Sequence, residues 1–166
     1  MALTYTAIAT VTVGSGGAAN IQFTSIAASW TDLLIKISGR SDANNVGIDI
    51  ALNGVTTNQS YRRLRGDGSA ASSTTLTALR VINGYSTATA NTFGNTEVYI
   101  PNYAGSTNKS LSADGVNENN ATEAYADLGA GLWSNTSAIT SITLTPNSGN
   151  FVQYSTATLY GIKNTV

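Results

Sequence analysis

The sequence lacks the two residue types that most often carry nucleophilic and metal chemistry. Among its 166 residues there is no cysteine and no histidine. Thiol nucleophiles, disulfide bonds, zinc sites of cysteine and histidine, and pairs of serine or cysteine with histidine are therefore excluded. Any chemistry must rest on carboxylates, amines, hydroxyls and aromatic rings.

Carboxylate chemistry is the enzymatic alternative that remains. A glycoside hydrolase needs two carboxyl groups about 5 to 9 Å apart on either side of a sugar. The chain has nine Asp and Glu residues, but a sequence alone does not show which of them converge. We therefore predict that the protein is not an enzyme.

Two segments carry several side-chain oxygens that a calcium ion could use. The first contains Asp42, Asn44, Asn45 and Asp49, and the second contains Asp114, Asn117, Glu118 and Asn119. Neither matches the spacing of a known calcium loop, and Asp and Asn are common turn residues in any case. We predict no metal and no cofactor.

Positive charge is concentrated in one place, at Tyr61, Arg62, Arg63 and Arg65. Arginine is favoured at protein interfaces, so this group is a candidate partner interface. An edge strand that is protected from aggregation by its charges explains the group equally well. The tripeptide Arg65-Gly66-Asp67 also occurs in some cell-adhesion ligands, but Gly-Asp-Gly-Ser is typical of an ordinary turn, and a turn is what we predict.

Aromatic side chains are the other candidate contact residues, because rigid amphipathic rings stack on sugars and anchor protein interfaces. Strand alternation favours a buried role for about half of them. The set comprises Trp30, Tyr61, Tyr85, Tyr99, Tyr103, Tyr125, Trp133, Tyr154 and Tyr160.

The elements that must position these residues are predicted to be β-strands. Thr, Ser and Asn number 24, 18 and 17, whereas only 10% of residues are charged, and helix formers such as Glu, Lys and Gln are scarce. Alternation with a period of two begins at once: the odd positions from residue 3 to 13 are all apolar, which predicts a half-buried strand. Residues 124–133 alternate as well, with Ala126, Leu128, Ala130 and Leu132 on one face and Tyr125, Asp127, Gly129, Gly131 and Trp133 on the other.

About ten short strands follow from this pattern. The other predicted strands lie near residues 20–26, 32–40, 46–53, 59–65, 76–82, 96–100, 109–116, 142–144 and 151–162. Turns are expected at 14–17, Asn53-Gly54 and Asn83-Gly84, and mobile surface loops at 66–75 and 86–95. A helix over 119–127 is the alternative to a strand there, but Gly129 and Gly131 disfavour its continuation.

Residues 1–166 are therefore predicted to form one all-β domain, an antiparallel two-sheet sandwich of jelly-roll type, with a barrel as the alternative.

The formal net charge of −1 makes nucleic acid an unexpected partner, since duplex binding requires several clustered cations. The longest aliphatic run is Leu33-Leu34-Ile35, so no membrane association is expected. The N-terminus shows no signal peptide, and synthesis in a cytoplasm is expected.

Several short segments resemble virion proteins of tailed bacteriophages. In the last third of the chain these are residues 142–151 (ITLTPNSGNF) and 155–162 (STATLYGI). Residues 61–66 (YRRLRG) and 100–105 (IPNYAG), together with the opening at 5–8 (YTAI), are similar to small structural proteins of aquatic phages, including phages of cyanobacteria.

The resemblance implies a jelly-roll virion module with no catalytic residues. Some such modules are cement or decoration proteins on the capsid exterior, which would bind and stabilise neighbouring major capsid proteins. Others are domains of tail fibres or spikes, for which a host-surface glycan or receptor would be the partner. The brevity of the chain favours the cement or decoration role, and by analogy we expect a homotrimer.

Overall fold

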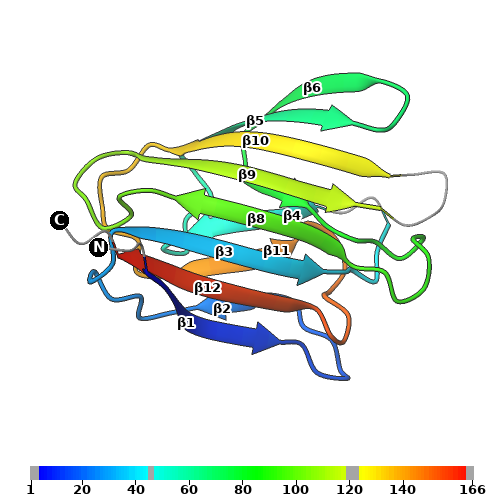
Figure 1. Ribbon diagram of the computed structural model, residues 1–166, viewed down its shortest axis with the longest axis horizontal. Coiled ribbons are helices and arrows are strands. Elements are labelled where there is room, and N and C mark those ends of the chain that lie inside the picture. Colours follow the sequence, from blue (N-terminus) through cyan, green and yellow to red (C-terminus); the bar gives the residue numbers. More distant parts are fainter. Residues whose placement is uncertain (1–3, 45–46, 119–123, 164–166) are drawn as a thin grey trace.

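The computed structural model describes residues 4–44, 47–118 and 124–163, and in these ranges the chain contains strands and no helix (Figure 1). The strands are β1 (Thr4–Thr12), β2 (Ile21–Phe23), β3 (Asp32–Gly39), β4 (Gly47–Leu52), β5 (Gln59–Gly66), β6 (Ala71–Leu76), β7 (Arg80–Ile82), β8 (Gly94–Ile100), β9 (Lys109–Asn117), β10 (Tyr125–Trp133), β11 (Ile142–Pro146) and β12 (Thr156–Lys163).

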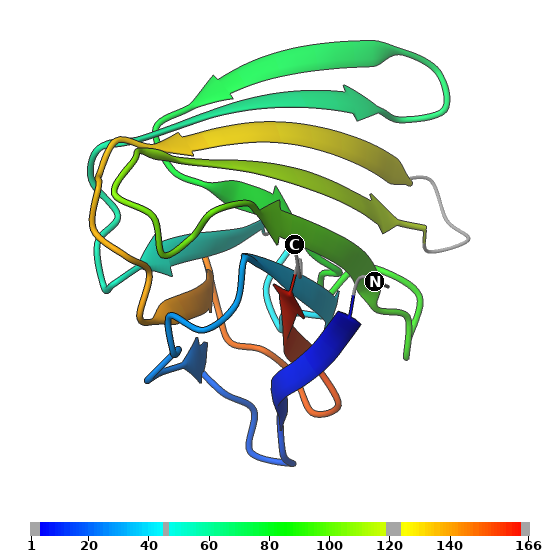
Figure 2. The same ribbon diagram turned by 60° about the vertical axis from the view of Figure 1, so that its left-hand side comes forward.

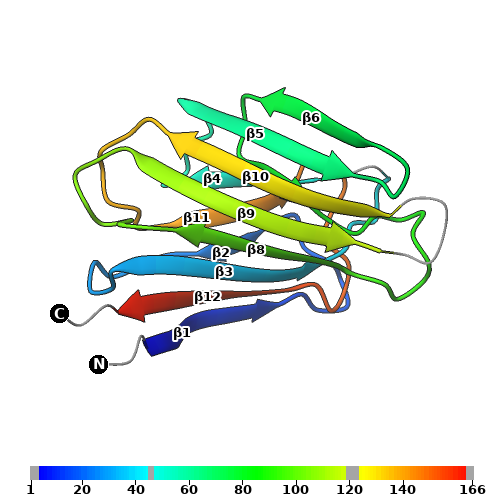
Figure 3. The same ribbon diagram turned by 45° about the horizontal axis from the view of Figure 1, so that its top comes forward.

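These strands form two antiparallel sheets. The larger sheet has eight strands in the order β1-β12-β3-β8-β9-β10-β5-β6, and Figure 3 shows them in this order from one edge to the other. The smaller sheet has four strands in the order β2-β11-β4-β7. The fold prediction is therefore confirmed as an all-β two-sheet sandwich, and the barrel alternative is wrong because neither sheet closes on itself.

The topology separates into a framework and two added hairpins. Without β5, β6, β9 and β10, the remaining eight strands form two sheets of four, in the orders β1-β12-β3-β8 and β2-β11-β4-β7. Counted along the chain, these are the orders first-eighth-third-sixth and second-seventh-fourth-fifth, which is the arrangement of a jelly roll. The hairpins β5–β6 and β9–β10 extend one framework sheet beyond its partner sheet.

We call the four added strands β9, β10, β5 and β6 the wing. Strand β7, at the edge of the smaller sheet, packs across the layers against β8, β9 and β10. The wing continues past this edge, and Figure 2 shows β5 and β6 arching away from the smaller sheet. The wing therefore has one face toward β7 and one face toward solvent.

The core lies between the two framework sheets, where the alternation behaves as expected. Leu33, Ile35 and Ile37 of β3 face Ile48 and Ile50 of β4 across the layers, and all five are at most 2% exposed. Complete burial of one such side chain contributes about 1.5 to 3 kcal/mol relative to an exposed one. β-branched residues at alternate positions thus both form these strands and hold the sheets together.

The predicted facing of the first strand is confirmed for Val11 and Val13, which pack on the core, and is wrong for the odd positions before them. Tyr5 is 57% exposed, and Ala7 and Ala9 are exposed as well. A bulge between Ala7 and Ala9 shifts the register against β12, so that Ile8 packs on the core instead. A bulge reverses the alternation beyond it, which is why a continuous odd-numbered face does not form. Leu3 lies outside the described residues.

The predicted loops and turns need several corrections. Residues 66–75 are not a long loop, because Asp67 closes a tight turn by accepting hydrogen bonds from the amides of Ser69 and Ala70, and β6 follows. The turn predicted for the Gly-Asp-Gly-Ser segment at 66–69 is confirmed, since the hydrogen bonds close it between Asp67 and Ala70. Residues 76–82 are likewise divided between the end of β6 and the short β7. Residues 71–82 thus contain two strands, β6 and β7, where one was expected. The described residues form twelve strands in all, compared with the predicted number of about ten.

Of the Asn-Gly pairs, one makes the expected turn. Asn53 and Gly54 have φ values of 52° and 72°, and Leu52 and Val55 pair across them, as in a tight hairpin. Gly84 instead forms a bridge with Arg40. The segment after it is held by the Arg40 guanidinium, which donates to the carbonyls of residues 86, 88, 89 and 92, so a mobile loop over 86–95 is not what the structure shows.

Two predicted elements differ at their ends. The final strand begins at Thr156 rather than at 151, because Phe151 leaves the sheet to pair with Ala18 and Ser41. Tyr125 already belongs to β10, so the helix alternative is wrong for the described part of 119–127. Residues 119–123 lie outside the described ranges.

Candidate binding surfaces on the wing

The predicted interface group of Tyr61, Arg62, Arg63 and Arg65 lies on β5, in the wing, and strand alternation divides it. Tyr61, Arg63 and Arg65 face the smaller sheet, whereas Arg62 points to solvent on the opposite face. Tyr61 is only 2% exposed. It is therefore a core residue, and its assignment to a partner surface is corrected here because its ring fills the space between the layers. The interface role of the three arginines stays a prediction.

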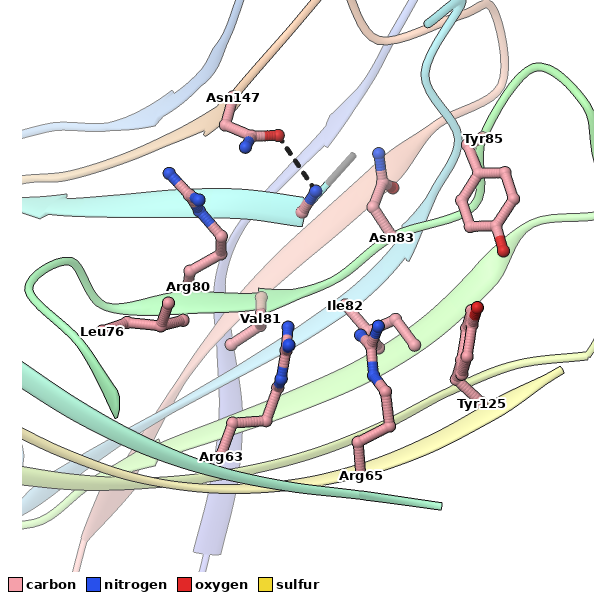
Figure 4. A pocket seen from close by; sticks show the side chains of 11 residues that line it. Arg63, Arg65, Leu76, Arg80, Val81, Ile82, Asn83, Tyr85, Tyr125 and Asn147 are labelled. Atoms are coloured by element: carbon pink, nitrogen blue, oxygen red, sulfur yellow. Dashed lines mark hydrogen bonds between the residues drawn. The ribbon is translucent and has the colours of Figure 1, made fainter. Parts of the chain in front are cut away.

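A cleft opens where the wing extends past β7. Its volume is about 290 Å³, and β5, β7 and the segments beside them line it (Figure 4). The lining residues are Gly47, Arg63, Arg65, Leu76, Arg80, Val81, Ile82, Asn83, Tyr85, Tyr125 and Asn147.

Three arginines reach this cleft, and two of them are paired. Arg65 donates from Nε and Nη2 to the two carboxylate oxygens of Asp127, at 2.7 and 2.8 Å. Arg80 makes the same two-pronged contact with Asp49. Arg63 has no acceptor among the described residues, and its Nε is buried. Burial and the neighbouring Arg65 lower the pKa of the Arg63 guanidinium, yet a guanidinium remains charged at neutral pH.

Tyrosines and asparagines form the rest of the polar lining. Tyr85 and Tyr125 stand at one end of the cleft with their hydroxyl groups directed toward each other (Figure 4). The Arg65 guanidinium lies 4.2 Å from the centre of the Tyr125 ring, which is a cation–π contact. Asn83 is 1% exposed, and neither its Oδ1 nor its Nδ2 has a partner among the described residues. Asn147 accepts a hydrogen bond from the amide of Gly47.

The opposite face of the wing is apolar and open to solvent. Leu64, Val116, Leu128 and Leu132 are 51%, 47%, 59% and 37% exposed. Leu64 lies directly opposite Leu128 in the β5–β10 ladder, and Val116 lies opposite Ala126 in the β9–β10 ladder. Several of these side chains border a shallow hollow of about 490 Å³. We call Leu64, Val116, Ala126, Leu128, Ala130 and Leu132 the apolar face.

Comparison with protein-family models, with curated proteins and with solved structures found no match for this chain. The function must therefore be argued from these two surfaces and from the sequence.

The apolar face exists because β10 directs its alternating apolar residues toward solvent and not toward the core. Its leucines and alanines point outward, and its inward positions are Tyr125, Asp127, Gly129, Gly131 and Trp133. The two glycines make room for side chains from other strands. A Cβ at position 129 would lie 1.6 Å from the hydroxyl oxygen of Tyr61, and one at 131 would lie 2.7 Å from side chains of Leu79 and Leu111.

We expect Gly129→Ala to lower the free energy of unfolding by about 1 to 3 kcal/mol, the usual cost of overpacking a core. The matched control is Gly66→Ala on the paired strand, because a Cβ there meets nothing within 4 Å. The control should be neutral or stabilising by up to about 1 kcal/mol. Urea denaturation of both variants measures this, and equal stabilities would contradict the packing of Tyr61 against Gly129.

Tyr61 also gives the fold a dependence on alkaline pH. Burial, with a further contribution from the negative charge of Asp127, raises the pKa of Tyr61 to about 12 from the ordinary value of 10.0. The unfolded chain then loses this proton before the folded chain does. Stability associated with Tyr61 is present below pH 10 and is lost as pH rises toward 12.

We therefore expect the unfolding free energy of the parent to fall between pH 10 and 12 more steeply than that of Tyr61→Phe, each measured by urea denaturation at several pH values. Tyr154→Phe, at a side chain that is 67% exposed, controls for the loss of one phenol. A Tyr61→Phe curve that is parallel to the parent curve would show that Tyr61 does not titrate in this way.

About half of the aromatic residues were expected to be buried, and the structure shows four of the nine in that state, namely Tyr61, Tyr85, Tyr103 and Trp133. Tyr154 is exposed, and Trp30, Tyr99, Tyr125 and Tyr160 are half-buried.

The cleft residues Arg80, Asn83 and Asn147 were not predicted as site residues from the sequence, because no local pattern marks residues that come together only through the fold.

Two acidic residues of the first oxygen-rich segment are engaged in other ways. Asp42 accepts from the amide of Asn150, and Asp49 pairs with Arg80. Within the described ranges, acidic side chains do not gather in a group of three or more that could hold a metal ion. Asn45 and Asn119 lie outside those ranges. The described residues also contain no helix of the length and apolarity needed to cross a membrane.

Proposed function

We propose that the protein is a non-enzymatic structural protein of a tailed-bacteriophage virion, a cement or decoration protein on the capsid exterior. In this role it binds neighbouring major capsid proteins through the apolar face of the wing. The observation that carries the proposal is the alignment of four large apolar side chains that are 37% to 59% exposed on adjacent strands. A contiguous exposed apolar patch typically marks an interaction site.

The surroundings of the apolar face also suit a protein partner. Arg62 and Asp114 lie at exposed positions beside it, on β5 and β9. An apolar centre with a charged rim is the usual composition of a protein interface. Each contact needs to contribute only a few kcal/mol, because many copies would act together on one capsid.

The wing itself supports an attachment role. Its hairpins are additions to a jelly-roll framework that already has its own core, so the apolar leucines of β10 are not needed to close that core. Function is commonly carried by such additions to a stable scaffold. We extend the proposal to a trimer, the assembly that the resemblance to phage virion proteins favours.

Quantitative mass spectrometry of purified particles tests this proposal. The copy number of the protein is measured against that of the major capsid protein. Hundreds of copies in a simple ratio to the capsid subunit are expected. A few copies would contradict a cement role and place the protein in the tail, and absence from the particle would overturn every virion role.

The cleft favours a second candidate function, a tail fibre or spike module that binds host-surface glycan. Tyrosine, arginine and asparagine side chains line it together, and these are residue types that stack on sugars and hydrogen-bond to them. A glycan array with the purified protein separates the two candidates, since saturable binding to a host saccharide would count against a purely structural role.

A further inference from the structure

The cleft contains a positive charge that no described carboxylate neutralises. Asp127 and Asp49 are each engaged by Arg65 and Arg80 through both oxygens. This leaves Arg63 as the uncompensated guanidinium, with a buried Nε and no acceptor among the described residues. Arg63 is half-buried, and even partial burial of a charge without a partner is unfavourable. An anion bound in the cleft would remove this cost.

Neutral polar groups that line the cleft with Arg63 also lack partners in the described part of the chain. Asn83 lines the same cleft and offers an amide donor and a carbonyl acceptor, although it is 1% exposed. Because buried polar groups are nearly always hydrogen-bonded, two atoms without a partner among the described residues are available to a hydrogen-bonding ligand or to an ordered water that a ligand can replace. Hydroxyl groups, which both donate and accept, would satisfy both atoms of Asn83.

The shape of the cleft limits the size of the ligand. Its volume of about 290 Å³ lies at the lower end of small-molecule sites, about 300 to 1,000 Å³. Tyr85 and Tyr125 close one end (Figure 4). Tyr85 is only 3% exposed, whereas Tyr125 is half-buried, and a tyrosine ring accepts the apolar face of a sugar while its hydroxyl hydrogen-bonds. One sugar ring fits this combination better than an extended chain does.

We propose that the cleft binds the carboxylate of an acidic sugar, with Arg63 recognising the charge and Asn83 recognising the hydroxyl groups. A single uncompensated guanidinium matches a monoanion, and a carboxylate accepts two parallel hydrogen bonds from it. This inference goes beyond the structural role proposed above and does not rest on it, because the cleft and the apolar face lie on opposite faces of the wing.

The test is an NMR titration of the isotope-labelled protein with methyl β-D-glucuronide and with methyl β-D-glucoside, which differ in the carboxylate. Glucuronide is expected to bind and to shift the amide signals of the lining residues, and glucoside to bind far more weakly. Arg63→Gln should weaken glucuronide binding by about 10- to 100-fold, the usual effect of losing a hydrogen bond to a charged group. Arg62→Gln, one position away on the outward face, should leave it unchanged.

Titrations with two further ligands show which part of the glucuronide the cleft recognises. Acetate supplies the carboxylate without the sugar, and inorganic phosphate supplies a different anion. Both are expected to bind more weakly than glucuronide. Asn83→Ala should bring the affinity for glucuronide toward that for acetate, because the carboxylate contact alone then remains.

Each other outcome overturns part or all of the proposal. Equal binding of glucoside and glucuronide would show that charge is not recognised, and equal binding of acetate and glucuronide would show that the sugar is not. Preference for phosphate would reject the carboxylate. Arg63→Gln should also keep or raise the unfolding temperature, since it removes a half-buried charge that has no acceptor among the described residues. If it unfolds instead, Arg63→Lys, which keeps the charge but not the fork of donors, takes its place in the titration.

Discussion

Asp127→Ala is expected to lower the free energy of unfolding by about 3 to 5 kcal/mol, the usual cost of removing one partner of a buried ion pair. Asp127 is 6% exposed and accepts both hydrogen bonds that Arg65 donates. Its loss would leave the Arg65 guanidinium unpaired next to Arg63, which already has no acceptor among the described residues. Two adjacent uncompensated cations would then face the cleft.

Urea denaturation of three variants measures this effect. Asp127→Ala should be strongly destabilised, whereas Asp114→Ala, an exposed carboxylate on the neighbouring strand β9, should change stability by no more than about 0.5 kcal/mol. The double variant Arg65→Met/Asp127→Leu removes both charges and should recover most of the lost stability. A single variant as stable as the parent would mean that Asp127 does not hold Arg65 in the folded protein.

The framework of the fold was predictable from the sequence because each framework strand buries its own apolar positions. A strand was predicted over 32–40, and its alternating residues Leu33, Ile35 and Ile37 are the ones that face the core. The turn at Asn53-Gly54 was predictable for a similar local reason, since both residues adopt positive φ with little strain. Where local preference and tertiary packing agree, a sequence pattern is sufficient.

In the wing, the local sequence pattern and the tertiary packing disagree. In β10 the apolar residues alternate as in a core strand, yet they face solvent, because Gly129 leaves the space that the Tyr61 hydroxyl group occupies. No pattern within residues 124–133 shows that a tyrosine from β5 will fill the inner layer. The bulge in β1 is a second case, since one inserted residue reverses the facing of an otherwise regular alternation.

The cleft was only partly predictable for the same reason. The arginines of β5 were singled out as a group, but the prediction did not separate Arg63 and Arg65, which lie on the side of Tyr61, from Arg62 on the opposite face. Their partners come from distant segments: Arg80 lies on β7, and Asn147 follows β11. These segments come together under the wing only because the jelly-roll connections pass between the two sheets. No local sequence signal encodes those connections.

Placing glutamate at two positions of the apolar face, in the variant Leu64→Glu/Leu128→Glu, is expected to abolish attachment to the capsid while leaving the fold intact. Both leucines are more than half exposed and lie opposite each other, so the folded monomer does not depend on their burial. Loss of two buried leucines at an interface costs about 1.5 to 3 kcal/mol each, which lowers affinity by at least about 100-fold. Two carboxylates facing an apolar partner would weaken it further.

The measurement is occupancy on particles that lack the protein, after addition of purified parent or variant, with circular dichroism as the check on folding. Gln22→Glu/Gln153→Glu adds the same charge at exposed positions away from the apolar face, and it should bind as the parent does. Parental occupancy of the Leu64→Glu/Leu128→Glu variant would contradict attachment through this face. Because Arg63→Gln alters only the opposite face of the wing, it should leave occupancy unchanged, so the two surfaces can be tested independently.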